Sequence, residues 1–184
     1  RRGLAMNKRL LSVLVSAALA IGHAGGVMAG DLNVDEVQAE LDAATPEQPA
    51  DFSGHDLRYL DLSGMDLSGA NLAGANLSEA RLENTCLEGA SLIGTNLDHA
   101  WLAGADLSNA NVSGATLRQT QLSGARLAAA DFTQADLSDA TFADATMAEA
   151  DFTGALIQGT DFAGAERSGT RGLNVPESVV SSTG

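Results

Sequence analysis

Every fifth residue from position 52 to position 162 is apolar, and this period limits the folds open to the chain more than any other feature. Read from Ala50 to Gly164, the sequence divides into 23 consecutive pentapeptides without a break. The third position is apolar in all 23, and all five phenylalanines of the chain stand there. The first position is Ala or Thr in 20 of them, the exceptions being His55, Leu60 and Met65. A regularity of this length indicates a repeat architecture.

A five-residue period fits neither a helix nor an ordinary strand, which repeat every 3.6 and every two residues. A coil with four sides fits it, if each side turns its third-position and first-position side chains inward and the other three outward. A narrow interior has no room for two large side chains per side, which explains the small first position. The predicted core begins with the third-position residues Phe52, Leu57, Leu62, Leu67, Leu72, Leu77, Leu82, Leu87, Leu92, Leu97, Leu102 and Leu107.

The repeats, such as ANLAG at 70–74 and ADLSN at 105–109, resemble the A(D/N)Lxx pattern of the pentapeptide-repeat family. The resemblance covers residues 50–164. It implies an all-β fold, a right-handed quadrilateral β-helix in which four pentapeptides make one coil of 20 residues. These residues then form about six coils and a rod about 28 Å long at the usual strand spacing. The family motif is structural, so the resemblance carries no catalytic, cofactor-binding or metal-binding residue to this chain.

Residues 30–49 are predicted to form a short cap helix and a linker before the first coil. Asn33 followed by Glu36 is typical of a capping box. One helical face is apolar, and it is formed by Val34, Val37, Leu41 and Ala44. Such a helix covers the open end of a solenoid, where apolar side chains and unpaired edges promote aggregation. His55, Leu60 and Met65 are expected to point inward beneath it.

The C-terminal end of the repeat is marked by a charge. Arg167 falls on a third position, where burial without a partner is unfavourable. We therefore expect the β-helix to end at Gly164 and residues 165–184 to form a C-terminal tail.

Residues 1–29 have the pattern of a secretory signal peptide. Lys8 and Arg9 precede an apolar run at 10–22, which is too short for a comfortable membrane span. Cleavage is expected after Ala29, with Ala24 as a second option, and Met6 as the initiator. Export by the general or the twin-arginine route both remain open, as does an uncleaved anchor. The expected location is periplasmic or secreted, with no membrane association after cleavage.

The charge of the chain excludes whole classes of partner. The full sequence carries 24 acidic and 10 basic residues, a net charge of −14. Removal of residues 1–29 takes away four basic residues and no acidic one, which lowers the net charge to −18 and leaves no lysine. A surface this acidic repels phosphate backbones, so no direct nucleic-acid binding is expected. Cys86 is the single cysteine, so the chain forms no internal disulfide.

Catalysis is not expected, because no nucleophile, base and orienting group converge. His55 and His99 occupy different repeat positions, and the repeated serines have no histidine in register. Glu79, Asp98 and His99 share a corner but offer one nitrogen ligand, and a solvated corner is the better interpretation. We therefore predict no enzyme activity, no cofactor and no metal.

Outward residues 20 apart are predicted to stack, and this stacking identifies contact candidates. Trp101 lies on the outside next to Arg81, which we expect to stack on the indole. Cys86 lies on the adjacent side as an idle or cross-linking thiol. Phe132 pairs with Phe152 and Phe142 with Phe162, and Phe162 is left uncovered at the C-terminal end. Either the tail covers it, or two copies form a homodimer through it.

These observations favour an exported structural or protein-interaction scaffold with an unknown protein partner. The alternative is an acidic rod that mimics DNA and binds a type II topoisomerase, as family members that protect gyrase or confer quinolone resistance do. Export distinguishes the two classes, since a topoisomerase is cytoplasmic. Fold-level analogy is a weak warrant for the second.

Overall fold

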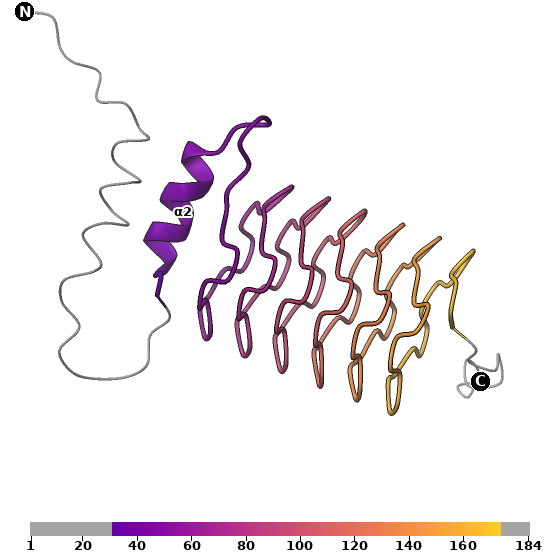
Figure 1. Ribbon diagram of the computed structural model, residues 1–184. Helices are drawn as coiled ribbons and strands as arrows, with labels where there is room; N and C mark the ends of the chain where they lie inside the picture. Colours follow the sequence, from indigo (N-terminus) through magenta and orange to yellow (C-terminus); the bar gives the residue numbers. More distant parts are fainter. Residues whose placement is uncertain (1–30, 174–184) are drawn as a thin grey trace, which may run out of the picture.

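A computed structural model describes residues 31–173, which form a rod with one short helix at its N-terminal end (Figure 1). Helix α2 spans Val34–Ala43. The predicted signal peptide and cleavage site lie outside the described residues, as does most of the predicted tail. Within residues 31–173, no helix has the length and apolar character that crossing a membrane requires.

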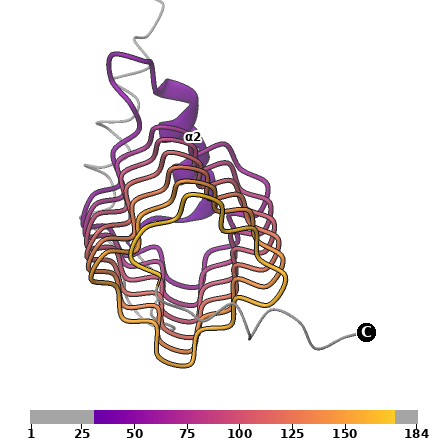
Figure 2. The same cartoon turned by 90° about the vertical axis from the view of Figure 1, so that its right-hand side faces the viewer.

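The rod is a right-handed quadrilateral β-helix with a coil of 20 residues, which confirms the predicted fold. Seen from its end, the chain traces nested four-sided coils (Figure 2). Parallel bridges join second-position residues 20 apart, from Asp51↔Asn71 to Asp151↔Arg171. We number the four sides by the second-position residue of the first coil. Faces 1, 2, 3 and 4 begin with Asp51, Asp56, Asp61 and Asp66.

Backbone hydrogen bonds tie each coil to both of its neighbours. The Leu97 N–H donates to the Thr116 carbonyl of the next coil at 2.7 Å, and the Asn96 N–H donates to the Ala75 carbonyl of the previous coil at 3.0 Å. The Ala100 N–H closes a turn on the Leu97 carbonyl at 3.0 Å. Interior backbone groups therefore find partners without long strands.

Third-position and first-position side chains fill the interior. All twelve residues of the predicted core, Phe52 to Leu107 in steps of five, are 0 % exposed. Three first-position threonines are buried as well, and each hydroxyl donates to a third-position carbonyl 23 residues earlier. These bonds are Thr85 to Leu62, Thr95 to Leu72 and Thr120 to Leu97, at 3.0, 2.8 and 2.8 Å. The hydroxyl is thereby satisfied in an apolar interior.

The second position favours Asp and Asn because their side chains bond the backbone two residues later. The Oδ1 of Asp66, for example, accepts the Ser68 N–H at 3.0 Å, and that of Asn111 accepts the Ser113 N–H at 3.0 Å. The side chain and the N–H of Ser68 lower the pKa of Asp66. This local bond holds each side in register with its turn.

Each side ends in a turn whose fifth-position residue has a positive φ, the conformation that glycine adopts at no steric cost. Gly114 has a φ of 64°, and a β-carbon placed there would meet no atom within 4 Å. Gly114→Ala should therefore lower stability through the backbone alone, by about 1 kcal/mol. Ala129→Gly, at a φ of 55°, should shift the melting temperature in the opposite direction. Equal melting temperatures for both variants and the natural chain would contradict this account of the turns.

Helix α2 covers the N-terminal end of the interior. The predicted capping box is confirmed: the Glu36 N–H donates to the Asn33 Oδ1 at 3.1 Å, and the Asn33 N–H donates to the Glu36 Oε2 at 2.8 Å. Val37 is 0 % exposed. Partly buried apolar residues of the helix and of the first coil pack against the same core, namely Leu41, Ala44, Leu60 and Met65.

His55 does not point fully inward, and that prediction is wrong. Its side chain is 38 % exposed, and its Nδ1 lies 2.9 Å from the Asp31 Oδ2. The other Asp31 oxygen accepts the Asp56 N–H at 2.7 Å. An imidazole needs a polar partner, and Asp31 supplies one outside the apolar interior.

The β-helix continues past Gly164, so the predicted boundary at that residue is also wrong. Bridges Thr146↔Glu166 and Asp151↔Arg171 extend the coil to Arg171. Arg167 occupies the third position of its pentapeptide, but its side chain is only half-buried, because no further coil follows it within the described residues. Long charged side chains can bury their stems and keep the head group in water. The apolar core therefore ends before Arg167, whereas the coil continues past it.

Candidate binding surface

One corner of the β-helix, between faces 2 and 3, carries a residue other than glycine in five coils, against one to three coils at each of the other corners. Five successive coils place a residue with positive φ there: Tyr59, Glu79, His99, Gln119 and Asp139, at 64°, 59°, 61°, 56° and 58°. A β-carbon in the left-handed region costs about 1 kcal/mol or more. The sequence accepts this cost five times at one corner, which is typical of a functional surface.

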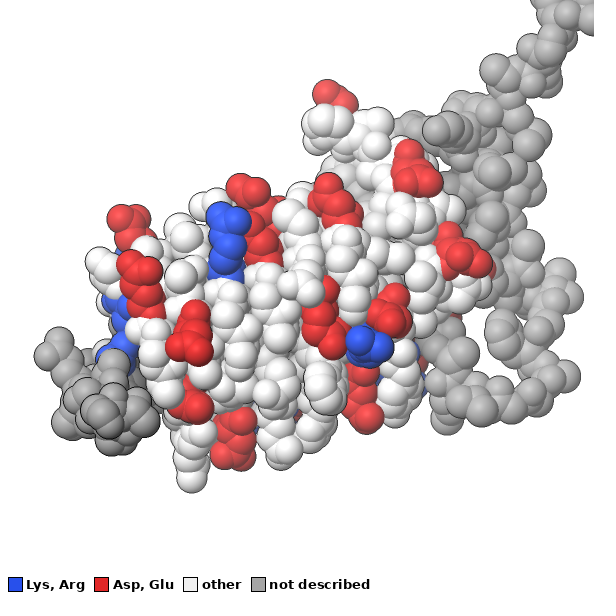
Figure 3. Space-filling view, turned by 180° about the vertical axis from the view of Figure 1, so that it is seen from behind, with Lys and Arg blue, Asp and Glu red and all other residues white. Residues whose placement is uncertain are grey.

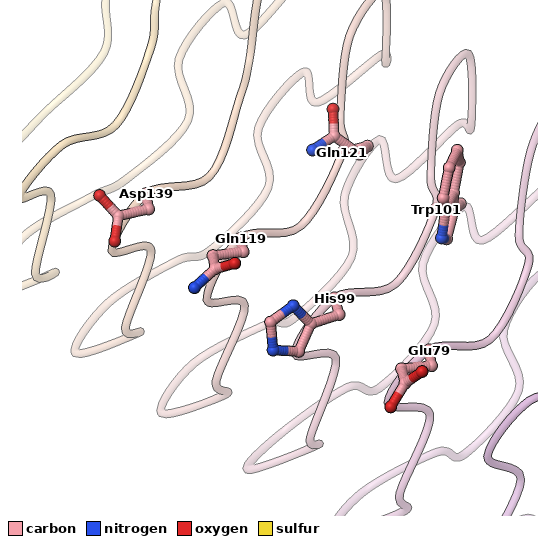
Figure 4. Close-up of a pocket in the computed structure, with 6 residues that line it drawn as sticks. All are labelled: Glu79, His99, Trp101, Gln119, Gln121 and Asp139. Carbon is pink, nitrogen blue, oxygen red and sulfur yellow. The ribbon is translucent and has the colours of Figure 1, made fainter.

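A groove of about 740 Å³ runs along this corner. Figure 4 shows its two rows of side chains, one from the fifth position of face 2 and one from the second position of face 3. The lining residues are Glu79, His99, Gln119 and Asp139 in the first row and Trp101 and Gln121 in the second. We call these six residues the corner groove. It combines an aromatic face with two amides and one imidazole. A carboxylate lies at each of its two ends.

Trp101 is the largest exposed side chain of the corner groove, with 53 % of its surface accessible. Its backbone is fixed on both sides by the bridges Arg81↔Trp101 and Trp101↔Gln121. The expected stacking of Arg81 on the indole is wrong. The guanidinium turns the other way, where it lies 3.3 Å from Asp61 and 3.5 Å from Glu83. Two carboxylates attract a cation more strongly than an exposed ring does, so the indole face stays open.

The other two contact candidates lie elsewhere, so the four residues Trp101, Arg81, Cys86 and Phe162 do not form one surface. Cys86 is on face 4, half-buried, with its Sγ 2.9 Å from the Ser68 hydroxyl oxygen. Phe162 is only 7 % exposed, so the expectation that no further coil covers it is wrong, and the residues beyond it belong to the predicted tail. Ala165 continues the buried core beyond it, and Leu173 packs against that core. A homodimer through this end stays a prediction, but Phe162 cannot supply its contact area.

The predicted ring pairs are confirmed. The ring centroids of Phe132 and Phe152 lie 5.0 Å apart, and those of Phe142 and Phe162 lie 5.2 Å apart, both stacked. Edge-to-face contacts link the two stacks across the interior, at 5.9 Å between Phe132 and Phe142. The four rings lie toward the C-terminal end of the interior, where Leu137 and Met147 supply the third positions of the other two faces.

The histidines and their neighbours do not converge on a reaction centre. His55 belongs to the N-terminal cap, and His99 is exposed in the corner groove. Asp98 faces away from His99 toward the next coil, where its Oδ1 accepts the Arg118 N–H at 2.9 Å. Within residues 31–173, Glu79, Asp98 and His99 do not form a cluster of metal-ligand geometry.

Arginines on the outer faces pair with carboxylates of the same or neighbouring coils. Arg118, for example, donates from Nε to the Asp136 Oδ2 at 2.7 Å. Bonding from Ser138, together with that guanidinium, lowers the pKa of Asp136. Within residues 31–173 many carboxylates have no basic partner, and acidic side chains are spread over the face in Figure 3 with few basic ones among them. The rod is therefore anionic along its length.

Several solved structures are similar to the chain. HetL, a pentapeptide repeat protein involved in heterocyst differentiation regulation from Nostoc sp. PCC 7120, is 26% identical over 63% of this chain and 73% of its own, with a TM-score of 0.33. A trypsin-treated variant of QnrB1, a plasmid-mediated fluoroquinolone resistance protein, is 20% identical over 72% and 76%, with a TM-score of 0.44. Rfr23 from Cyanothece 51142 is 22% identical over 74% and 97%, with a TM-score of 0.32. Comparison with curated protein sequences found no match.

Likeness at these TM-scores says nothing about whether the chain shares a role with HetL or QnrB1. The repeats themselves are more specific. A family model of pentapeptide repeats matches residues 50–89, 90–127 and 120–159, with eight copies. Because these ranges cover more than half of the chain, the protein belongs to the pentapeptide repeat family.

Proposed function

We propose that this pentapeptide-repeat protein is an exported protein-interaction scaffold that binds its partner along the corner groove. The observation that carries the proposal is the exposed indole of Trp101, which lines one groove with four non-glycine residues in the left-handed conformation. An exposed Trp in a concave, rigid setting is typical of an interface hot spot. The filled interior supports an action through the outer surface, since it has no room for a substrate.

The chemistry of the corner groove fits a polypeptide segment. The amides of Gln119 and Gln121 can donate and accept hydrogen bonds to a backbone, and Trp101 offers an apolar platform. Glu79 and Asp139, one at each end, favour basic side chains on the partner. Nucleic acid fits poorly, because phosphates would meet these carboxylates.

The binding surface is tested by a pair of matched substitutions. Trp101→Ala should weaken partner binding by about 30-fold or more, as loss of a hot-spot residue does. Ile93→Ala is the control, since Ile93 is an apolar residue on face 1 with 47 % exposure. Binding is measured by comparative pull-down from the exported fraction and then by titration with the captured protein. Equal loss in both variants, or full binding by Trp101→Ala, would contradict the assignment.

Export is tested separately by N-terminal sequencing of the protein recovered from cell fractions. The expected mature chain begins at Gly30 and is found in the periplasmic or secreted fraction. A chain that retains residues 6–29 in the cytoplasm would overturn the exported location and make a topoisomerase partner the first alternative to assay. This outcome would not contradict partner binding along the corner groove, so export and binding are tested independently.

A further inference from the structure

The corner groove ends in two carboxylates that have no basic partner within residues 31–173. Glu79 and Asp139 are both exposed, and neither takes part in an ion pair there. Two arginines next to the groove turn away from it. Arg81 pairs with acids of face 3 at 3.3 and 3.5 Å, and Arg118 pairs with acids of face 2 at 2.7 and 3.8 Å. Both ends of the groove are therefore open to a cation that a partner supplies.

Gly159 fixes the place where the groove ends. It takes the same corner position as Asp139 in the next coil, and a β-carbon added to it would overlap the Asp139 Oδ1. The missing side chain of Gly159 therefore leaves the space in which this carboxylate lies. Figure 4 shows Asp139 at one end of the fifth-position row and Glu79 at the other.

The pitch of the β-helix sets the distance between the two carboxylates. Glu79 and Asp139 stand in one column, 60 residues or three coils of 20 apart. At about 4.8 Å per coil, they lie about 14 Å apart along the rod. An extended chain rises about 3.4 Å per residue and turns alternate side chains to the same face, so its residues i and i+4 span that distance on one face.

The middle of the groove suits the same extended segment. Residue i+2 lies about 7 Å along the groove and faces the indole of Trp101, which is one coil from Glu79. The exposed amides of Gln119 and Gln121 can bond the free N–H and C=O groups of an extended backbone. A helix satisfies these groups internally and, at 1.5 Å per residue, would need its charges about nine or ten residues apart. The groove therefore favours an extended segment.

We propose, building on the partner binding proposed above, that the corner groove binds an extended segment with Lys or Arg at positions i and i+4 and an apolar residue at i+2. The two cations pair with Glu79 and Asp139, and the apolar side chain packs on Trp101. Because the hydrogen-bonded coils hold these three side chains at fixed heights, the groove selects the spacing of the partner's charges as well as their sign.

Fluorescence anisotropy of the full chain with two labelled peptides of equal charge tests the spacing. The peptides have blocked ends and the sequences Lys-Thr-Leu-Thr-Lys and Lys-Thr-Leu-Lys-Thr, so that non-specific attraction to the acidic rod is the same for both. The first peptide should bind about fivefold more tightly, because only its lysines reach both carboxylates. Glu79→Gln and Asp139→Asn should each remove this preference. Glu149→Gln, which neutralises a fifth-position acid of another corner, should keep it.

Equal affinity of the two peptides, or no saturable binding of either, would overturn the proposal. So would a preference that survives in both Glu79→Gln and Asp139→Asn, or tighter binding of a helical peptide with lysines ten residues apart. The proposed function would still stand after any of these results if Trp101→Ala loses the captured partner, so the two failures can be told apart. Circular dichroism of each variant checks that the coil stays folded, which is expected for substitutions at outward positions.

Discussion

Leu97→Asp should unfold the β-helix, with a loss of about 4 kcal/mol or more in the free energy of unfolding. Leu97 is 0 % exposed and lies in the middle of the rod. A carboxylate at this position would be surrounded by apolar side chains with no cation within reach, and burial of such a charge is among the largest single-residue penalties. Domains of this size are stable by about 5–15 kcal/mol, so much of the total is lost. Thermal and denaturant unfolding followed by circular dichroism measures the effect.

Asn96→Asp is the matched control for the charge. Asn96 precedes Leu97 but points outward, where its Oδ1 accepts the Asp98 N–H at 3.0 Å, and an aspartate keeps that acceptor. The same charge one residue away should change stability by no more than about 0.5 kcal/mol. If Leu97→Asp melts at the same temperature as the natural chain, the inward position of the third residue is refuted.

Phe142→Ala should cost about 3–5 kcal/mol, the second largest effect that we expect. The ring is fully buried and is the centre of the aromatic cluster. It stacks on Phe162 and makes edge-to-face contacts with Phe132 and Phe152 at 5.9 and 6.0 Å. Alanine removes the volume and the ring contacts together, and the hydrogen-bonded coils around it cannot collapse into the space. Denaturant unfolding gives the free energy.

Phe142→Leu distinguishes the stability lost with side-chain volume from the stability lost with the ring contacts. Leucine is the commonest third-position residue of this chain and should cost about 1.5 kcal/mol or less. Phe162→Ala, at the end of the stack with 7 % exposure, should fall between the two variants of Phe142. Equal stability of Phe142→Ala and Phe142→Leu would show that the ring cluster contributes nothing.

The interior could be read from the sequence because its pattern is strictly periodic. Residues such as Leu57 and Leu97 repeat every five positions, and no competing fold buries that pattern. The capping box was equally clear, because Asn33 and Glu36 satisfy each other locally. Both features depend on residues close in sequence or on an exact register.

The ends of the rod were harder to predict. His55 and Arg167 occupy inward positions of the repeat, yet both keep their polar groups accessible, because the first and last coils are open on one side. Periodicity describes the middle of a solenoid and says little about its terminal coils, which are atypical. The predicted end at Gly164 failed for this reason.

The candidate surfaces depend on side chains that no local pattern brings together. Because residues 20 apart stack, the sequence predicted that Trp101 lies next to Arg81. It did not predict that the Arg81 side chain turns toward Asp61 and Glu83. The corner groove joins two rows from different faces, and only the angle of the corner brings them together.

Trp101 is the single tryptophan of the chain, which makes it a direct probe of the central claim that the corner groove binds the partner. The chain is labelled with fluorotryptophan, so that its ¹⁹F spectrum contains one resonance from this indole. The partner found in the pull-down is then added, while binding is followed independently by calorimetry. We expect the resonance to shift and to become protected from solvent in step with the calorimetric titration. A partner that binds fully while the resonance keeps its position and solvent exposure would contradict the account.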